Sequence, residues 1–309
     1  MIQSWRSRKS LEEAVGRGYR GLLSHGYYLD HIWSAKAHYE VAPILSDQSH
    51  SSKIDHADRI LGGEACMWSE YVSEHTIDSR IWPRVLAIAE RLWSLSSVHN
   101  ADSLYARLFR MNHLLDRAQI GLTHMSLYKQ RLENLIRDPS KRKELLHPFT
   151  ILADACEPLG LVPRARLETY SSKVPLTTFT DALLSESESI WKLETQPVNN
   201  ATFAEIFRTW SINHVRLRSL FDDADKETNR RWWGQNIEQL SQNLAHVGQI
   251  GLRVVHYRST HRLHQQRNHT MNTWTLTSWL SHHENLLNQL EHHVLEVKLA
   301  AVQIGRAHV

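Results

Sequence analysis

Hydrophobic positions divide the chain into two parts with different spacing. In the first hundred residues, apolar runs at 1–5, 19–30 and 59–70 are separated by stretches with helical character. Strands that alternate with helices indicate parallel β/α units. From about residue 101 onward, apolar positions recur every three to four residues, as in amphipathic helices. The pattern therefore predicts an α/β region followed by an all-α region.

Capping and breaking residues mark the expected helices. Ser10 is the expected N-cap of a helix over 10–20, and Pro83 suits the first turn of a helix over 80–94.

In the second part, the helix over 104–122 is expected to bury one leucine-rich face, and Pro148 is expected to interrupt a helix over 143–160. Residues 160–185 have turn character. Long helices that form a bundle are expected over 201–221, 229–259 and 273–303. The buried face of the helix over 104–122 is expected to hold Leu104, Leu108, Met111, Leu114 and Leu115.

Composition and charge exclude several classes of protein. The 309 residues are 41% hydrophobic and 22% charged, which is ordinary for a globular protein with a sizeable core. The net charge is +3 and basic residues are scattered among acidic ones, so nucleic-acid binding is not predicted. No apolar run is long enough to span a bilayer. Cys66 and Cys156 lie far apart without ligand spacing, which favours two free thiols.

The 21 histidines invite a metal hypothesis that the sequence does not support. His261 and His264 have a spacing that places two imidazoles on one helix face. No acidic or cysteine partners stand at ligand spacing from them, so a solvated helix surface is the better interpretation. We expect neither a metal nor a cofactor.

Candidate chemistry lies where the three expected strands end. Trp5 follows the first run, Tyr28 and Asp30 the second, and Trp68 and Glu70 the third. Ligands meet the carboxyl ends of strands in parallel β/α folds. Indole and phenol rings pack on the C–H faces of a sugar, and carboxylates accept hydrogen bonds from its hydroxyls. Singly, each residue also fits the core, a helix cap or a solvated loop; together they favour a sugar pocket.

One stretch combines both kinds of group. In ILGGEACMWSEYV, Ile60 to Val72, the residues Trp68 and Glu70 are two apart, so an extended backbone would point them to the same side. That places a stacking surface beside a hydroxyl acceptor.

The same stretch carries a family resemblance. GGEACMWSEYV and RIWPRVLAIAERLWS, preceded by QSW and GYYLD, resemble the catalytic domain of glycoside hydrolase family 20, the β-N-acetylhexosaminidases. The resemblance covers roughly residues 1–120, and Ser69 stands where the family commonly has glycine. The helical part is similar, more weakly, to C-terminal extensions on some bacterial members.

The resemblance implies a fold and a domain organisation. It implies the last three β/α units of a (β/α)8 TIM barrel over 1–120, a helical and loop connection over 121–185, and a C-terminal helical domain over 186–303. Residues 304–309, IGRAHV, resemble the translation of a sequencing adapter, so we expect a non-native tail. Met1 leads directly into IQSW, which reads as the middle of a strand, so we expect a fragment of a longer hydrolase.

The resemblance also implies an activity. The family removes terminal β-linked N-acetylglucosamine or N-acetylgalactosamine from oligosaccharides or glycoconjugates, with the 2-acetamido oxygen of the substrate as nucleophile and retention of configuration. By the family pattern Tyr28 orients the acetamido group, Trp5 and Trp68 wall the pocket, and Asp30 and Glu70 bind outer hydroxyls. The catalytic Asp-Glu pair of the family ends strand four and is missing from these residues. This chain alone is expected to be inactive, because a barrel of three strands leaves unpaired edges and an exposed apolar face. Glu64, Arg84, Glu90 and Arg91 are interpreted as structural.

Two other classes of function stay open at the level of sequence. One is a helical interaction or scaffold protein in which residues 185–303 carry the function. The other is a non-catalytic amino-sugar-binding module that keeps the pocket but lacks the acid. Periplasmic and cytoplasmic locations are both open, as is the oligomeric state.

Overall fold

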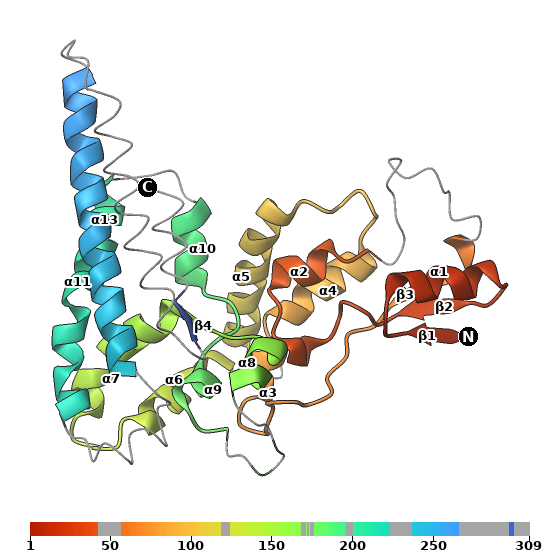
Figure 1. Cartoon of the computed structure of the whole chain (residues 1–309), viewed down its shortest axis with the longest axis horizontal. Coiled ribbons are helices and arrows are strands. Elements are labelled where there is room, and N and C mark those ends of the chain that lie inside the picture. Colours follow the sequence, from red (N-terminus) through yellow and green to blue (C-terminus); the bar gives the residue numbers. More distant parts are fainter. Residues whose placement is uncertain are drawn as a thin grey trace. The chain divides into compact units, whose positions relative to one another are not determined.

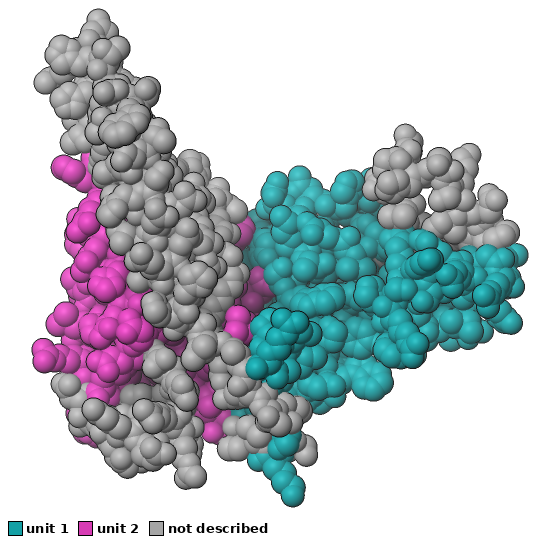
Figure 2. All heavy atoms as spheres, viewed as in Figure 1, with its two compact units in different colours: residues 1–125, 160–176 teal, residues 126–159, 177–309 magenta. Residues whose placement is uncertain are grey.

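A computed structural model of the chain shows two compact units (Figures 1 and 2). The first unit contains residues 1–125 and 160–176, and the second contains residues 126–159 and 177–309. The structure describes residues 1–42, 57–118, 124–167, 171, 173, 176–195, 200–222, 237–265 and 297–299. The expected tail over 304–309 therefore lies outside the described residues, and the predicted division at residues 120 and 185 stays a prediction.

A parallel three-stranded sheet organises the first unit. Its strands are β1 (Ile2–Ser4), β2 (Gly21–Leu23) and β3 (Ile60–Gly63), hydrogen-bonded in the order β1-β2-β3. Ile2 pairs with Gly21, and Gly21 pairs in turn with Ile60. All three carboxyl ends thus lie at the same edge of the sheet. The predicted succession of strands and helices in this part of the chain is confirmed.

Helices connect the strands and follow them. The first helix, α1 (Arg8–Gly16), begins after Ser7, whose side chain accepts a hydrogen bond from the Ser10 backbone N–H at 3.1 Å. The expectation that Ser10 caps this helix is therefore wrong, because Ser7 satisfies the free N–H group one turn earlier. The others are η1 (Leu29–His31), α2 (Ala35–Glu40), η2 (Ala57–Arg59), α3 (Ile77–Ile81), α4 (Arg84–Trp93), α5 (Ala101–Ala118) and α8 (Leu161–Leu167).

Two apolar clusters hold these elements in place. The first joins α1, the sheet and α4 and contains the buried residues Leu11, Val15, Leu23, Tyr27, Leu29, Ile60 and Ile88. The second joins α2, α4 and α5 and contains Ala35, Tyr39, Ala87, Leu104 and Leu108. Each fully buried leucine or isoleucine contributes on the order of 2 kcal/mol relative to exposure. The clusters therefore fix the loops that leave β2 and β3.

The buried face of α5 differs from the predicted one. Leu104 and Leu108 are buried as expected, but Met111 and Leu114 are exposed. The row of buried residues along α5 continues instead to Asn112. The prediction was wrong because residues at i, i+4 and i+8 form the contact, which turns positions 111 and 114 toward solvent.

The second unit is mainly helical. Its elements are α6 (His124–Leu135), α7 (Arg142–Asp154), β4 (Cys156–Pro158), α9 (Phe179–Ala182), α10 (Glu188–Thr195), α11 (Asn200–Asp222), α13 (Ile237–Gln265) and β5 (Val297–Leu299). The long helices α11 and α13 pack side by side. A Cβ atom at Gly248 would lie 2.5 Å from the Ser211 backbone nitrogen, so glycine permits the close approach. The predicted helix over 201–221 is confirmed, as is that over 229–259 where it is described.

Three local predictions in the second part are wrong. Pro148 lies inside α7 without ending it. Residues 160–185 include the short helices α8 and α9. Val297–Leu299 form β5, which pairs antiparallel with β4, where a helix was expected. The β4 strand lies about 140 residues earlier in the sequence, so local periodicity carries no information on this pairing.

Candidate active site

The carboxyl ends of β2 and β3 lead into two loops that hold four of the five candidate residues. The Asp30 loop, residues 24–34, carries Tyr28 and Asp30, and the Glu70 loop, residues 64–76, carries Trp68 and Glu70. A parallel bridge pairs Tyr28 with Cys66 beyond the strands. The Leu29 N–H donates to the Cys66 carbonyl at 2.9 Å, so the sheet pairing extends into both loops.

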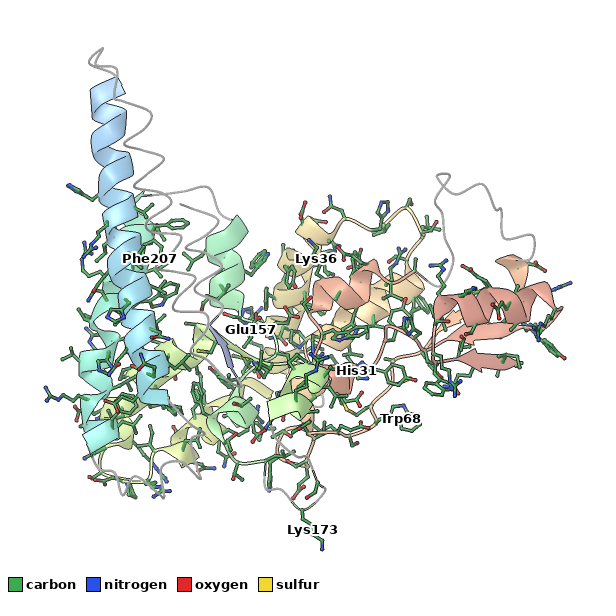
Figure 3. The ribbon with its side chains drawn as sticks, in the orientation of Figure 1. His31, Lys36, Trp68, Glu157, Lys173 and Phe207 are labelled. Atoms are coloured by element: carbon green, nitrogen blue, oxygen red, sulfur yellow. The ribbon has the colours of Figure 1, made fainter. Side chains whose placement is uncertain are left out.

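The paired loops bring aromatic rings together. The ring centroids of Tyr28 and Trp68 are 6.5 Å apart and tilted by 39°. Trp68 is 68% exposed, so part of its indole ring is accessible to a ligand. His31 stacks on Tyr28 with a centroid distance of 5.2 Å. Figure 3 labels His31 and Trp68, one on each loop. The two loops thus present a partly exposed aromatic surface.

Trp5 stands apart from this group. Its indole is 54% exposed, and among the described residues its ring interaction is with Arg6, whose guanidinium carbon lies 4.8 Å from the ring centroid. The structure therefore brings together Tyr28, Trp68, Asp30 and Glu70 but leaves Trp5 outside their contacts.

Asp30 and Glu70 form a hydrogen-bonded carboxyl pair. Asp30 is only 1% exposed. Burial, followed by the hydrogen bond with Glu70, raises the pKa of Asp30 to about 7, although backbone N–H groups of Asp30 and Trp68 act in the opposite direction. The same hydrogen bond lowers the pKa of Glu70. Below about pH 7 the pair therefore shares one proton, held mainly by Asp30 and donated to the Glu70 carboxylate.

The other oxygen of each carboxyl group is available to a ligand. Asp30 Oδ1 and Glu70 Oε2 are both buried and have no hydrogen-bond partner within the described part of the chain. Buried polar atoms in native proteins nearly always have a partner, so two unpartnered acceptors, one on each member of the pair, indicate a place for bound hydroxyl groups. Burial also raises the pKa of Tyr28, which keeps its hydroxyl protonated and able to donate.

The backbone of the Glu70 loop is left-handed at two non-glycine residues. The φ angles are 73° at Ser69 and 52° at Tyr71. A side chain in this region costs on the order of 1–2 kcal/mol per residue. The sequence analysis assumed an extended segment here, and that assumption is wrong. Trp68 and Glu70 instead face the Asp30 loop because the backbone turns at Ser69.

Residues outside the predicted set hold the Asp30 loop. Arg84 is fully buried on α4 and donates to the Leu29 carbonyl at 2.6 Å and to the Trp33 carbonyl at 3.0 Å. His38 Nδ1 lies 2.7 Å from the Gly26 carbonyl, and burial followed by the Arg84 charge lowers the pKa of His38 to about 4. His38 is therefore neutral at pH 7. The structural role predicted for Arg84 agrees with these contacts.

Glu64 also has a structural role, as predicted. Its carboxylate accepts hydrogen bonds from the Ser24 hydroxyl at 2.6 Å and from the Gln3 side chain, which links all three strands. His31 was missed by sequence reasoning. Its position directly after Asp30, at a strand end, is the signal that would have found it.

Among the described residues, no group of three or more His, Cys, Asp or Glu side chains is arranged to hold a metal ion. Within the same residues, no helix combines the length and the apolar character that crossing a membrane requires. Cys66 and Cys156 are both free thiols.

Comparisons with known proteins show what the first part of the chain is similar to. Residues 1–96 match the family model for the catalytic domain of glycosyl hydrolase family 20. The α subunit of β-hexosaminidase from Bos taurus is 40% identical over 119 residues, which are 35% of this chain and 21% of that protein. Subunit A1 from Dictyostelium discoideum is 35% identical over 113 residues, again 35% of this chain and 21% of the relative. The chain thus spans about a fifth of the length of the curated relatives it matches.

A solved structure is similar over nearly the whole chain. The X-ray structure of a chitobiase from Flavobacterium johnsoniae superimposes with a TM-score of 0.69 and 25% identity, covering 99% of this chain and 44% of that one. The helical second part therefore also has a counterpart in that enzyme. Residues 1–96 are thus similar to the catalytic domain of a family of glycoside hydrolases, glycosyl hydrolase family 20.

Proposed function

We propose that this chain forms the sugar-binding half of the active site of a β-N-acetylhexosaminidase. The observation that carries the proposal is the hydrogen-bonded Asp30–Glu70 pair, whose two unpartnered buried oxygens belong to the same two loops as the aromatic rings of Tyr28 and Trp68. A pyranose needs hydroxyl acceptors next to an aromatic face, and these four side chains supply both. The family match over residues 1–96 supports the same substrate class.

The proposed reaction is hydrolysis of terminal β-linked N-acetylglucosamine or N-acetylgalactosamine, with the 2-acetamido oxygen of the substrate attacking the anomeric carbon. Tyr28 donates a hydrogen bond to the acetamido carbonyl and holds this oxygen in line, an orientation effect that lowers the barrier. Trp68 walls the pocket, and we propose the same role for Trp5, although Trp5 lies outside the contacts among the other four residues. Asp30 and Glu70 accept hydrogen bonds from outer hydroxyls and so select a terminal sugar. The general acid comes from an Asp-Glu pair on an earlier strand.

The architecture that we propose around these residues is a (β/α)8 barrel to which this chain contributes three strands. The parallel order β1-β2-β3 and the helices between the strands support it. We further propose a bacterial type of enzyme with a C-terminal helical extension. The match to the Flavobacterium johnsoniae chitobiase over 99% of the chain supports this.

Sugar binding by the chain tests the proposed pocket. N-acetylglucosamine is titrated into the 309-residue chain, and binding is followed by NMR chemical-shift changes. We expect saturable shifts in both loops, and at least tenfold weaker binding for Asp30→Ala, which removes a buried hydrogen-bond partner, or for Glu70→Gln, which replaces the charged one. Glu74→Gln is the matched control, because Glu74 is exposed on the same loop. Equal binding by all variants would refute the proposal.

Turnover separates binding from catalysis. Because the acid is not among these residues, we expect no hydrolysis of a chromogenic N-acetylglucosaminide by this chain alone. Hydrolysis that disappears in Glu70→Gln would show instead that the chain supplies a complete catalytic apparatus.

A further inference from the structure

A short segment from the second half of the sequence belongs to the first unit. Residues 160–176 cluster with residues 1–125, and α8 at the start of this segment contacts η1. The element η1 carries Asp30. Residues far beyond the matched family domain therefore pack directly on a loop of the candidate site.

Gly160 fits closely against the Asp30 loop. A Cβ atom at Gly160 would lie 2.9 Å from the backbone carbonyl oxygen of His31. That distance is too short for a Cβ contact, and the neighbour is backbone, which moves only with the whole loop. Glycine at this position thus lets the segment reach the backbone directly after Asp30.

Arg164 fits closely against the Glu70 loop. Its guanidinium carbon lies 4.3 Å from the ring centroid of Tyr71, within the range of a cation–π interaction. Arg164 is 2% exposed and Tyr71 is 1% exposed, so the contact is shielded from water. A shielded cation–π contact is stronger than an exposed one. Tyr71 directly follows Glu70 and is itself left-handed.

We infer that residues 160–164 position the Asp30 and Glu70 loops relative to one another. Arg164 is the positioning residue, and its contact with the Tyr71 ring keeps that ring buried. The inference rests on the proposed function insofar as these loops form the sugar site. A left-handed backbone at Ser69 and Tyr71 persists only where surrounding contacts enforce it. Burial of the Tyr71 ring beneath Arg164 is such a contact, and it acts on the residue next to Glu70.

Amide hydrogen exchange in the full chain tests the positioning without any sugar. In Arg164→Leu we expect residues 68–72 to exchange about tenfold faster, the size of a shielded cation–π contact, while α4 exchanges as before. Arg164→Lys keeps a cation over the ring and should restore slow exchange. Arg166→Leu is the matched control, since Arg166 is exposed on the same helix. Unchanged exchange in residues 68–72, or equal acceleration in α4, would overturn the inference.

Two further readouts keep the inference separable from the proposed function. Gly160→Ala leaves Arg164 in place and should accelerate amide hydrogen exchange selectively at residues 29–33. If those amides exchange as slowly as in the unaltered chain, the positioning role is contradicted. With N-acetylglucosamine as the probe, Arg164→Leu should raise the dissociation constant about tenfold. Faster loop exchange in a chain that binds no N-acetylglucosamine would support the positioning and refute the proposed sugar site.

Discussion

The two loops that hold the carboxyl pair are stabilised in different ways. The Asp30 loop is fixed by side chains within the first hundred residues, above all by the hydrogen bonds of Arg84 to two of its carbonyl groups. Both loops contain left-handed non-glycine residues, Ile32 in the first and Ser69 and Tyr71 in the second, but the Glu70 loop also buries Tyr71 beneath Arg164. The difference teaches that the Asp30 side of the pair is fixed mainly by hydrogen bonds from a helix within the first hundred residues, whereas the Glu70 side depends on a side chain about ninety residues later in the sequence.

The largest expected effect comes from removing the anchor of the Asp30 loop. Arg84→Met leaves the Leu29 and Trp33 carbonyls without their buried donor, and each lost partner costs on the order of 1–3 kcal/mol. We expect a loss of about 3 kcal/mol or more in the opening free energy of the slowest amides of β2 and α4, measured by hydrogen exchange.

Arg107→Met serves as the control for that experiment. Arg107 pairs with Glu90 but is 44% exposed, so its loss should cost less than about 1 kcal/mol. Similar losses for both variants would show that Arg84 has no special anchoring role.

The second effect is a pH dependence that arises from Asp30. Its pKa of about 7 lies above the ordinary aspartate value of about 3.9. The folded state therefore binds more protons than the unfolded state between about pH 4 and 7, and this contribution to stability is lost as the pH rises through that window. The lowered pKa of Glu70 opposes this in direction.

Denaturant unfolding at several pH values, with the unaltered chain and Asp30→Asn compared, measures this contribution. Relative to Asp30→Asn, the unaltered chain should become less stable as the pH rises from 4 to 7. A difference between the two proteins that stays constant, or grows in the opposite direction, would contradict a protonated Asp30 in the folded state.

The smallest effect concerns the strain in the Glu70 loop. Ser69→Gly should stabilise the folded chain by about 0.5–1 kcal/mol, because glycine adopts a φ near 73° freely while its own entropic cost offsets part of the gain. Ser97→Gly provides the control, since Ser97 has no positive φ angle. Thermal unfolding compares the two variants, and equal or opposite shifts would argue against strain at Ser69.

Sequence reasoning recovered the features that depend on local pattern. The strand and helix order of the first hundred residues and the long helix over 201–221 follow from apolar spacing, and the structure contains them. The aromatic and acidic residues at strand ends follow from the rule that ligands meet carboxyl ends. Four of these five residues come together in the structure.

The features that were missed depend on contacts between distant residues. The pairing of Val297–Leu299 with β4 and the position of Arg164 above Tyr71 join segments separated by about a hundred residues or more. The left-handed turn at Ser69 was also missed, although the position where the family commonly has glycine is the kind of local signal that indicates a positive φ angle. The contacts between distant residues, by contrast, require the tertiary structure.

A crystal structure of the chain with bound N-acetylglucosamine tests the central claim most directly. We expect hydroxyl oxygens of the sugar within about 2.5–3.0 Å of Asp30 Oδ1 and Glu70 Oε2, with the ring against Trp68 and the acetamido carbonyl at the Tyr28 hydroxyl. A sugar bound elsewhere on the chain, with the carboxyl pair left without a hydroxyl partner, would contradict the account.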